Sequence, residues 1–212
     1  MIALILALAA AEPEMVRLEL KLPKPAFAGT PKNIPPGTTV QKPSGKTREL
    51  PLVPKGTANV ASKKPVTASD TEPVVGEASQ VTDGDKEAAD GSYVELGPGL
   101  QWVQVDLGSK RDIHAVAVWH FHGDARVYRD VVIQTADDPD FIENVQTLFN
   151  NDGDNSAGLG LGKDHEYFEM NEGLVIPVKA LASRYVRFYS QGSTADDMNR
   201  VTEVEIYATP PK

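Results

Sequence analysis

The chain has 212 residues, enough for one domain with extensions, and its 41% apolar content is ordinary for a globular protein. The formal net charge of −9 is divided unevenly: residues 1–57 hold 8 basic and 4 acidic residues, whereas residues 58–212 hold 13 and 26. The strongly acidic charge of residues 58–212 excludes nucleic acid as the partner, because these residues would repel its phosphates. Without cysteine there is neither a disulfide nor thiol chemistry, so stability depends on packing or on a bound metal.

Residues 1–11 form an apolar run that ends in small residues. The run is too short to span a bilayer, which needs about 20 apolar residues. Ala9-x-Ala11 before Glu12 is typical of a signal-peptide cleavage site. No basic residue precedes the run, so a truncated or misassigned start is the alternative. We expect a secreted, periplasmic or cell-surface protein with no membrane span.

Residues 12–57 are rich in proline and hold 9 of the 16 prolines in the chain. Proline interrupts helices and removes backbone donors from a sheet. Residues 16–22 are the exception, because apolar and charged side chains alternate there as in a half-buried edge strand. We predict a Pro-rich arm with one strand followed by an extended linker. Disorder throughout is the alternative.

From residue 58 onward, short apolar or alternating segments are separated by clusters of Gly, Asp and Asn, and no long amphipathic helix is visible. This pattern predicts a β-sandwich or barrel. One helical turn is predicted at residues 138–141, with Asp138 as N-cap and Pro139 in the first helical position. The predicted strands are residues 102–108, 113–121, 127–135, 145–149, 174–178, 184–189 and 201–208.

Two acidic segments, Thr82-Asp83-Gly84-Asp85 and Thr202-Glu203-Val204-Glu205-Ile206-Tyr207, frame this part of the chain. Between them lies Gln101-Trp102-Val103-Gln104-Val105-Asp106-Leu107-Gly108. In this order and spacing the segments resemble a discoidin domain, also called the F5/8 type C or galactose-binding-like domain. The resemblance covers residues 58–208 and leaves 209–212 as a tail. It implies an all-β jelly-roll sandwich that binds a ligand and is not an enzyme.

The resemblance also implies a structural calcium ion, because the two ends of the domain meet and often hold a cation in this family. Carboxylates of Asp83, Asp85 and Glu203 would repel one another when packed together. A Ca²⁺ ion takes six to eight oxygen ligands and reverses that cost. By the resemblance, the backbone carbonyls of Gln80 and Thr202 complete the set. The alternative is that these are turn residues and a solvated carboxylate.

One family ligand is missing, because Ala88 stands where a Thr is common. Asp90 or Ser92 in the same loop is the predicted replacement. A second acidic loop, residues 150–158, resembles a calcium loop of the D-x-D-x-S kind. Its Gly falls one place late, and Lys163 stands where a bidentate Glu should be. We therefore favour a polar surface loop there.

Sugar-binding members of the family use loops at one end of the sandwich, where hydrogen-bonding groups and an apolar plate meet the sugar. Polar side chains of suitable kinds follow the buried strand and lie in the loop before the last strand. The alternatives are ordinary polar loops, a satisfied histidine inside the sheet, and a less favoured zinc site from His120, His122 and Asp124. The predicted ligand contacts are His120, His122, Arg126, Asn199 and Arg200.

The leading hypothesis is an exported, calcium-stabilised module that binds carbohydrate, such as a cell-surface glycan. A protein-interaction module of an extracellular complex is the second, favoured by the basic, Pro-rich arm. A small glycoside hydrolase is a remote third, because a pair of carboxylates has no sequence signature. Gly158-Leu159-Gly160-Leu161-Gly162-Lys163 fits neither of the glycine-rich phosphate-binding motifs.

Overall fold

The computed structural model describes residues 13–42 and 48–210. The predicted signal peptide, residues 1–11, lies outside them. The predicted all-β sandwich is confirmed: the strands pair antiparallel, and the only helix in the described ranges is the short 3-10 helix η1 (Ala78–Thr82). The strands are β1 (Met15–Arg17), β2 (Leu52–Pro54), β3 (Ala58–Asn59), β4 (Val66–Ala68), β5 (Val94–Leu96), β6 (Gln101–His120), β7 (Val132–Ala136), β8 (Gln146–Asn150), β9 (Leu174–Ser190) and β10 (Asn199–Ala208).

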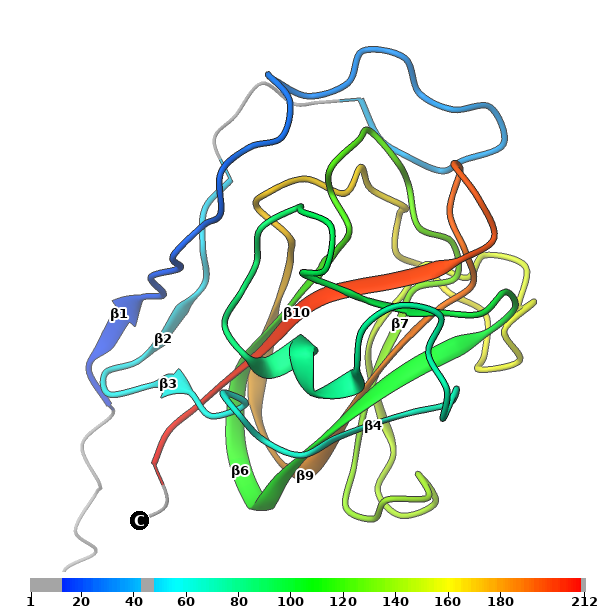
Figure 1. Cartoon of the computed structure of the whole chain (residues 1–212). Helices are drawn as coiled ribbons and strands as arrows, with labels where there is room; N and C mark the ends of the chain where they lie inside the picture. Colours follow the sequence, from blue (N-terminus) through cyan, green and yellow to red (C-terminus); the bar gives the residue numbers. More distant parts are fainter. Residues whose placement is uncertain (1–12, 43–47, 211–212) are drawn as a thin grey trace, which may run out of the picture.

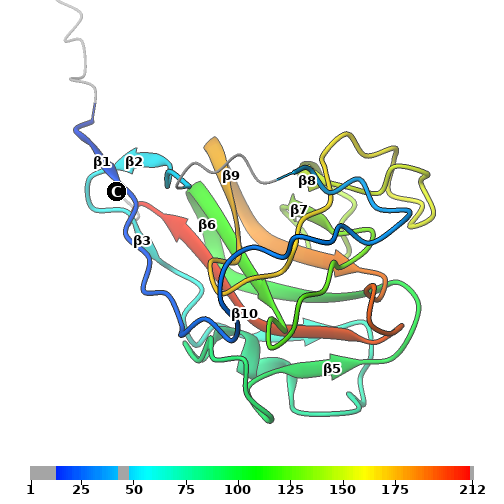
Figure 2. The same cartoon turned by 90° about the horizontal axis from the view of Figure 1, so that it is seen from above.

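Two long, bent strands, β6 and β9, make one sheet serve as two layers (Figures 1 and 2). The hydrogen-bonded order is β3-β10-β6-β9-β7-β8, with β4 on β6 and β5 on β10. The first half of β6 pairs with β4 and the end of β9, and its second half pairs with β10 and the start of β9. The register breaks between Asp106 and Arg111, where Gly108 adopts φ 81°. Segments predicted as separate strands are therefore halves of one bent strand.

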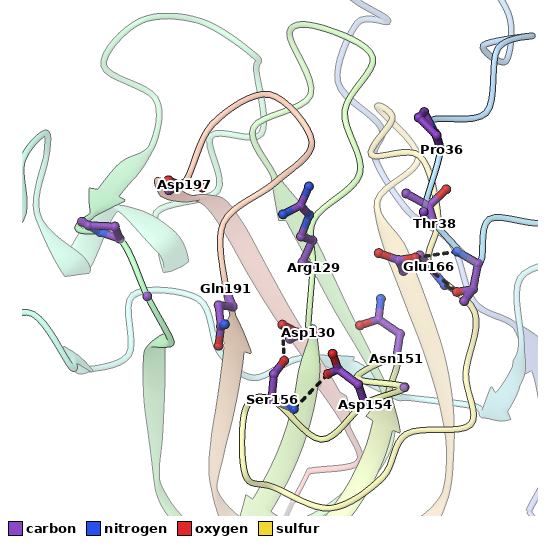
Figure 3. Close-up of a pocket in the computed structure, with 15 residues that line it drawn as sticks. Pro36, Thr38, Arg129, Asp130, Asn151, Asp154, Ser156, Glu166, Gln191 and Asp197 are labelled. Atoms are coloured by element: carbon purple, nitrogen blue, oxygen red, sulfur yellow. Dashed lines mark hydrogen bonds between the residues drawn. The ribbon is translucent and has the colours of Figure 1, made fainter.

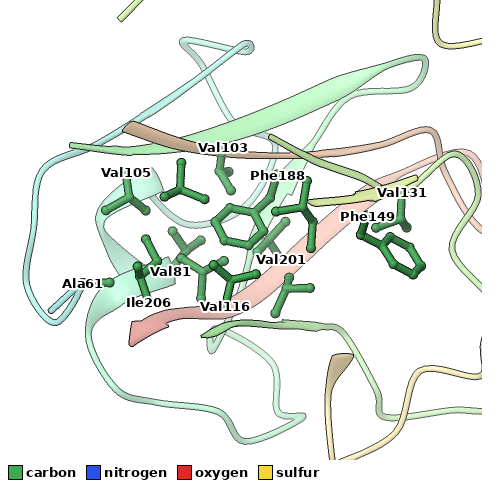
Figure 4. Close-up of a cluster of buried hydrophobic side chains, with 14 of the residues drawn as sticks. Ala61, Val81, Val103, Val105, Val116, Val131, Phe149, Phe188, Val201 and Ile206 are labelled. Atoms are coloured by element: carbon green, nitrogen blue, oxygen red, sulfur yellow. The ribbon is translucent and has the colours of Figure 1, made fainter. Parts of the chain in front are cut away.

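The main core fills the space between the two layers (Figure 4). Val103 and Phe188 come from one layer, and Val116 and Ile206 come from the other. Alternation along each strand sends every second side chain inward, as the period of two requires. The near-continuous apolar run of residues 113–121 is buried on both faces, because Ala115, Ala117 and Trp119 face a second cluster.

The Pro-rich arm covers that second face of the sandwich. β1 pairs antiparallel with β2, from Met15 opposite Pro54 to Arg17 opposite Leu52. Leu18 is 5% exposed and Val53 is 2% exposed, and both belong to the second apolar cluster. The predicted strand at residues 16–22 is thus shorter than expected, and its partner β2 was not predicted. The arm is a packed cover rather than a free linker. The other members of the cluster are Ala115, Ala117, Trp119 and Tyr207.

The predicted turn at residues 138–141 is present as a single turn, in which the N–H of Phe141 donates to the Asp138 carbonyl at 3.4 Å, but it does not continue into a helix. The Asp138 carboxylate accepts hydrogen bonds from the backbone N–H groups of Asp140, Ile142 and Glu143, so Asp138 caps the turn as predicted and also closes the loop that follows. Phe141 has φ 58°, which is outside the right-handed helical region. No helix in the described residues is long and apolar enough to cross a membrane.

Candidate functional site

The two acidic segments lie side by side, as the resemblance implies. The backbone N–H of Gly84 donates to Oε2 of Glu203 at 3.2 Å, although the two residues are 119 positions apart. Helix η1 places Asp83 close enough for its charge to act on Glu203. Both residues sit where the loop after η1 meets β10.

Glu203 is a buried carboxylate without enough partners. Its side chain is 0% exposed, and Oε1 has no hydrogen-bond partner among the described residues. Burial raises the pKa of Glu203 to about 8, and the negative charges of Glu205 and Asp83 add to the rise. The hydroxyl of neighbouring Thr202 is also buried and unpaired. A cation beside Glu203 would fit this environment.

The other predicted calcium ligands do not converge on Glu203 as closely. The Asp85 carboxylate accepts hydrogen bonds from Ser92 Oγ and from the N–H of Glu87, and Asp83 Oδ1 accepts from the N–H of Asp85. Asp83, Asp85 and Asp90 are exposed. The carbonyl of Gln80 accepts the N–H of Asp83 at 3.2 Å. The predicted ligand set therefore stays a prediction, of which Glu203 is the best-supported member.

Glu205, next to this site, has its own counter-charge. Lys86 Nζ lies 2.6 Å from Glu205 Oε1, and each side chain is 8% exposed. The Tyr207 hydroxyl donates to Glu205 Oε2, and Lys86 Nζ lies 4.7 Å from the centre of the Trp119 ring. Lys86 is thus bound to Glu205. Of these two neighbouring buried carboxylates, Glu203 and Glu205, only Glu203 lacks an ion-pair partner in the part of the chain described here.

The histidines and Arg126, predicted as ligand contacts, lie inside the wall of the fold. His120 is 1% exposed, shares a hydrogen bond with Glu169 Oε2 at 2.9 Å, and stacks on Tyr128. His122 is 0% exposed, and its Nε2 lies 2.9 Å from the Lys86 carbonyl. Arg126 is held by two hydrogen bonds to Asp124. Nothing in the geometry tests their predicted role in binding. Their internal hydrogen bonds instead show that they hold the loops in place.

Asn199 and Arg200 fasten the loops at the same end of the sandwich. Asn199 Oδ1 accepts from Ser190 Oγ and from the N–H of Gly192, and its Nδ2 donates to the carbonyls of Gly97 and Gly99. All four hydrogen-bonding positions of the amide are thus occupied. Arg200 pairs with Glu95 and Asp196.

A cavity of about 840 Å³ opens among these loops (Figure 3). Its walls come from the β5–β6 loop with Pro98, the β6–β7 loop with Arg129, the β8–β9 loop with Asn151, and the β9–β10 loop with Gln191. The fifth wall is residues 36–39 of the arm. No aromatic side chain lines it among the described residues. None of the five predicted ligand contacts lines the cavity, although Gln191 and Asp197 come from the loop before the last strand that the sequence marked as polar.

Glu166 fastens the arm to this cavity. The N–H of Thr39 donates to Glu166 Oε2 at 2.6 Å, and the N–H of Glu166 donates to Thr39 Oγ at 3.0 Å. His165 Nδ1 lies 3.1 Å from the Thr39 carbonyl. Nothing in the sequence signals this contact, because the residues are 127 positions apart and neither belongs to a recognisable motif.

One side of the cavity is strongly acidic. Carboxylate oxygens of Asp130, Asp152 and Asp154 lie within 4.8 Å of one another. Ser156 Oγ donates to Asp130 Oδ2 at 3.0 Å. Burial raises the pKa of Asp130; the charges of Asp152, Asp154 and Glu166 raise it further, and the Ser156 hydrogen bond lowers it. The sequence marked residues 150–158 as an acidic loop but missed Asp130, which comes from a different loop.

Asn151 contributes a buried donor that lacks a partner. The side chain is 4% exposed, and its Oδ1 accepts the N–H of Val131 at 2.7 Å. Its Nδ2 has no acceptor among the described residues. In Figure 3 the amide nitrogen points toward the space between Arg129 and Glu166. A buried donor left unpaired is costly, so an acceptor at this point would stabilise the site.

No family model matches the sequence, and no curated protein matches it. Solved structures do resemble its fold. A chitosan-binding module from a Paenibacillus chitosanase/glucanase is 23% identical with a TM-score of 0.51, over 71% of this chain and 99% of the module. A CBM32 module of Clostridium perfringens, solved with GlcNAc-α-1,4-galactose, is 13% identical with a TM-score of 0.52, over 74% of this chain and 97% of the module.

A third match is part of a longer enzyme chain. A truncated AlyQ with CBM32 and alginate lyase domains is 20% identical with a TM-score of 0.50, and the match covers 70% of this chain and 32% of that one. At these identities the likeness establishes the fold. The structure is therefore a discoidin-like β-sandwich of the kind found in CBM32 carbohydrate-binding modules.

Proposed function

We propose that this chain, with the fold of the discoidin-like carbohydrate-binding modules, binds carbohydrate without catalysis in the cavity between its loops. The observation that carries the proposal is the polar cavity of about 840 Å³ at one end of the sandwich. Two solved structures with this fold are a chitosan-binding module and a module in complex with GlcNAc-α-1,4-galactose. Those ligands belong to those proteins, and they support the class of ligand proposed here.

The lining of the cavity suits a sugar. Hydroxyl groups need both donors and acceptors at fixed positions. Arg129, Asn151 and Gln191 offer donors, and the carboxylates opposite them offer acceptors. The rings of Pro36 and Pro98 are the apolar surfaces against which C–H groups of a sugar can pack.

The test is a binding screen over a glycan panel, followed by calorimetry with the best ligand. Arg129 is exposed and has no ion-pair partner in the described ranges. We expect Arg129→Ala to weaken binding about tenfold, because a hydrogen bond from a charged donor contributes about 1.5–3 kcal/mol. Lys179→Ala, a change at an exposed residue of β9 outside the cavity, is the matched control and should bind as the unmodified chain does.

If no glycan on the panel binds, the proposal is contradicted and the protein-interaction alternative is favoured. That alternative drew on an arm free to reach a neighbouring molecule. In the structure the described part of the arm packs on its own sandwich through Leu18, Val53 and Thr39. Release of sugar products during the screen would instead favour the glycoside hydrolase.

We also propose that a calcium ion binds where the two ends of the domain meet. The support is Glu203, which is fully buried, short of a partner and beside Asp83. Carbonyl and carboxylate oxygens of this region are the ligands that calcium prefers. When bound, the ion would supply positive charge to Glu203 and join the loop after η1 to β10. Its role would be structural, since the cavity is built from other loops.

A further inference from the structure

The cavity carries an excess of negative charge that the protein itself does not balance. Asp130, Asp154, Glu166 and Asp197 line it, and Arg129 is the single cationic side chain in its lining among the described residues. Buried Asp152 lies directly behind, with its carboxylate within 4.8 Å of those of Asp130 and Asp154. Carboxylates packed this closely repel one another, so a positively charged group on the ligand would relieve the repulsion.

The free oxygens of the acidic side match an ammonium group better than a metal ion. Asp152 already accepts the N–H groups of Ser156 and Ala157, and Asp154 Oδ1 also accepts from Ser156. Asp130 Oδ2 accepts from the Ser156 hydroxyl. Of these carboxylate oxygens, one on Asp130 and one on Asp154 accept no hydrogen bond from the described residues. Calcium requires six to eight oxygens, whereas an ammonium group offers three donors.

The unpaired amide nitrogen of Asn151 is an independent sign of what the ligand carries. It is a buried donor in the wall of the cavity, so it calls for an oxygen acceptor rather than a cation. Arg129, also a donor, lines the same cavity. A ligand that satisfies both sides presents hydroxyl oxygens to Asn151 and Arg129, and a positive charge to Asp130 and Asp154.

We propose that the cavity selects amino sugars, meaning sugar units with a free, protonated amino group, over neutral, N-acetylated and acidic sugars. The inference rests on the proposed function and names its ligand class. N-acetylation removes the charge that the carboxylates would pair with. A uronic acid adds a fifth carboxylate to the four in the lining and is repelled.

The test compares oligomers of glucosamine and galactosamine with three relatives of each: the N-acetylated form, the neutral hexose and the uronic acid. Calorimetry at constant pH should give an affinity for the amino form about tenfold or more above that for its N-acetylated form, as expected for a charge-assisted hydrogen bond. The preference should shrink as salt is added, because screening weakens exposed charge pairs.

Two variants locate the preference in the cavity. Asp130→Asn and Asp154→Asn should each lower the affinity for the amino form about tenfold more than they lower the affinity for the neutral hexose. Asp112→Asn removes the same charge at the bend of β6, outside the cavity, and should keep the full preference. Thermal melting of each variant shows whether it is folded, and if one is not, the other carries the test.

The outcomes separate this inference from the proposed function. Binding of neutral or N-acetylated sugars as tightly as amino sugars overturns the inference and leaves carbohydrate binding intact. Binding that a chelator abolishes and that Asp130→Asn also abolishes identifies a metal site and overturns it too. If no sugar of any kind binds, the proposed function fails and the inference fails with it.

Discussion

Gly162 shows how one residue shapes the β8–β9 loop, which carries Asn151 and Asp154 of the cavity. A Cβ at this position would lie 2.5 Å from the carbonyl oxygen of Asn150 and 2.7 Å from the nitrogen of Asp152. The N–H of Gly162 donates to the Asp152 carbonyl at 2.7 Å, so the loop folds back on itself at this point. Only a residue without a side chain permits so close an approach.

Gly162→Ala should therefore lower the free energy of unfolding by about 2 kcal/mol, the usual cost of forcing a methyl group into a packed site. Gly153→Ala is the matched control in the same loop, because nothing lies within 4 Å of its Cβ position. Urea unfolding of both variants measures the difference. Equal stability of the two would mean that the loop gives way without cost.

Residues of the site could be predicted only where the segment that contains them resembles a known domain. Asp83 and Glu203 belong to segments that resemble a known domain, and the structure brings them together. Asp130, Asn151 and Glu166 were not predicted, because Asp130 comes from the β6–β7 loop, the other two lie far apart in the long β8–β9 loop, and only the fold brings them to one cavity. His120 and His122 carry a chemistry that suggests a site, but burial gives them internal partners.

Among the elements, the arm departs most from expectation. Proline content indicated an extended linker, and most of the described arm does lack regular structure. Its apolar residues nevertheless find a surface, because Ala115 and Ala117 on β6 leave a shallow face beside Trp119. Local patterns showed a strand in the arm. They could not show that the second face of β6 needs a cover, since that requires knowing which strand is central.

Leu18→Ala tests the arm as a cover. Leu18 is 5% exposed and packs in the cluster with Trp119 and Tyr207, so truncation should lower the free energy of unfolding by about 2 kcal/mol, the low end for a buried leucine. Leu22→Ala, at a residue of the same arm that is 46% exposed, should change it by less than about 0.5 kcal/mol. Denaturant unfolding measures both. A Leu18 variant as stable as the control would show that the arm adds nothing to the sandwich.

At the scale of the whole molecule, the proposed calcium ion joins two segments about 120 positions apart. Calcium at about one hundred times its dissociation constant should stabilise the fold by about 2.7 kcal/mol, because it binds the folded state only. Glu203→Gln should abolish that response, whereas Glu143→Gln, a change at an exposed residue elsewhere, should retain it. Melting curves of metal-free protein with calcium or chelator give the answer, and curves that coincide would rule out the ion.

The same experiment has a pH dependence with a definite sign. In metal-free protein the pKa of Glu203 is about 8, raised by burial from its ordinary value of 4.5. Between these two pKa values the folded state holds a proton that the unfolded state has lost. The free energy of unfolding therefore falls as the pH rises from about 4.5 to about 8. Glu203→Gln should show a flatter profile in chelator. A profile as steep as that of the unmodified chain would assign the slope to other groups.

The strand order has a consequence for how the molecule folds. β10, the last strand in sequence, lies between β3, at the start of the sandwich, and β6. During synthesis the earlier strands have exposed edges until residues 199–208 of β10 emerge, and until then the apolar side of the arm lacks its contact with Tyr207. Contacts of such long sequence separation slow folding and leave sticky intermediates. The sandwich should therefore complete its folding only after β10 has been made, in one cooperative step. Truncation within β10 should impair that folding.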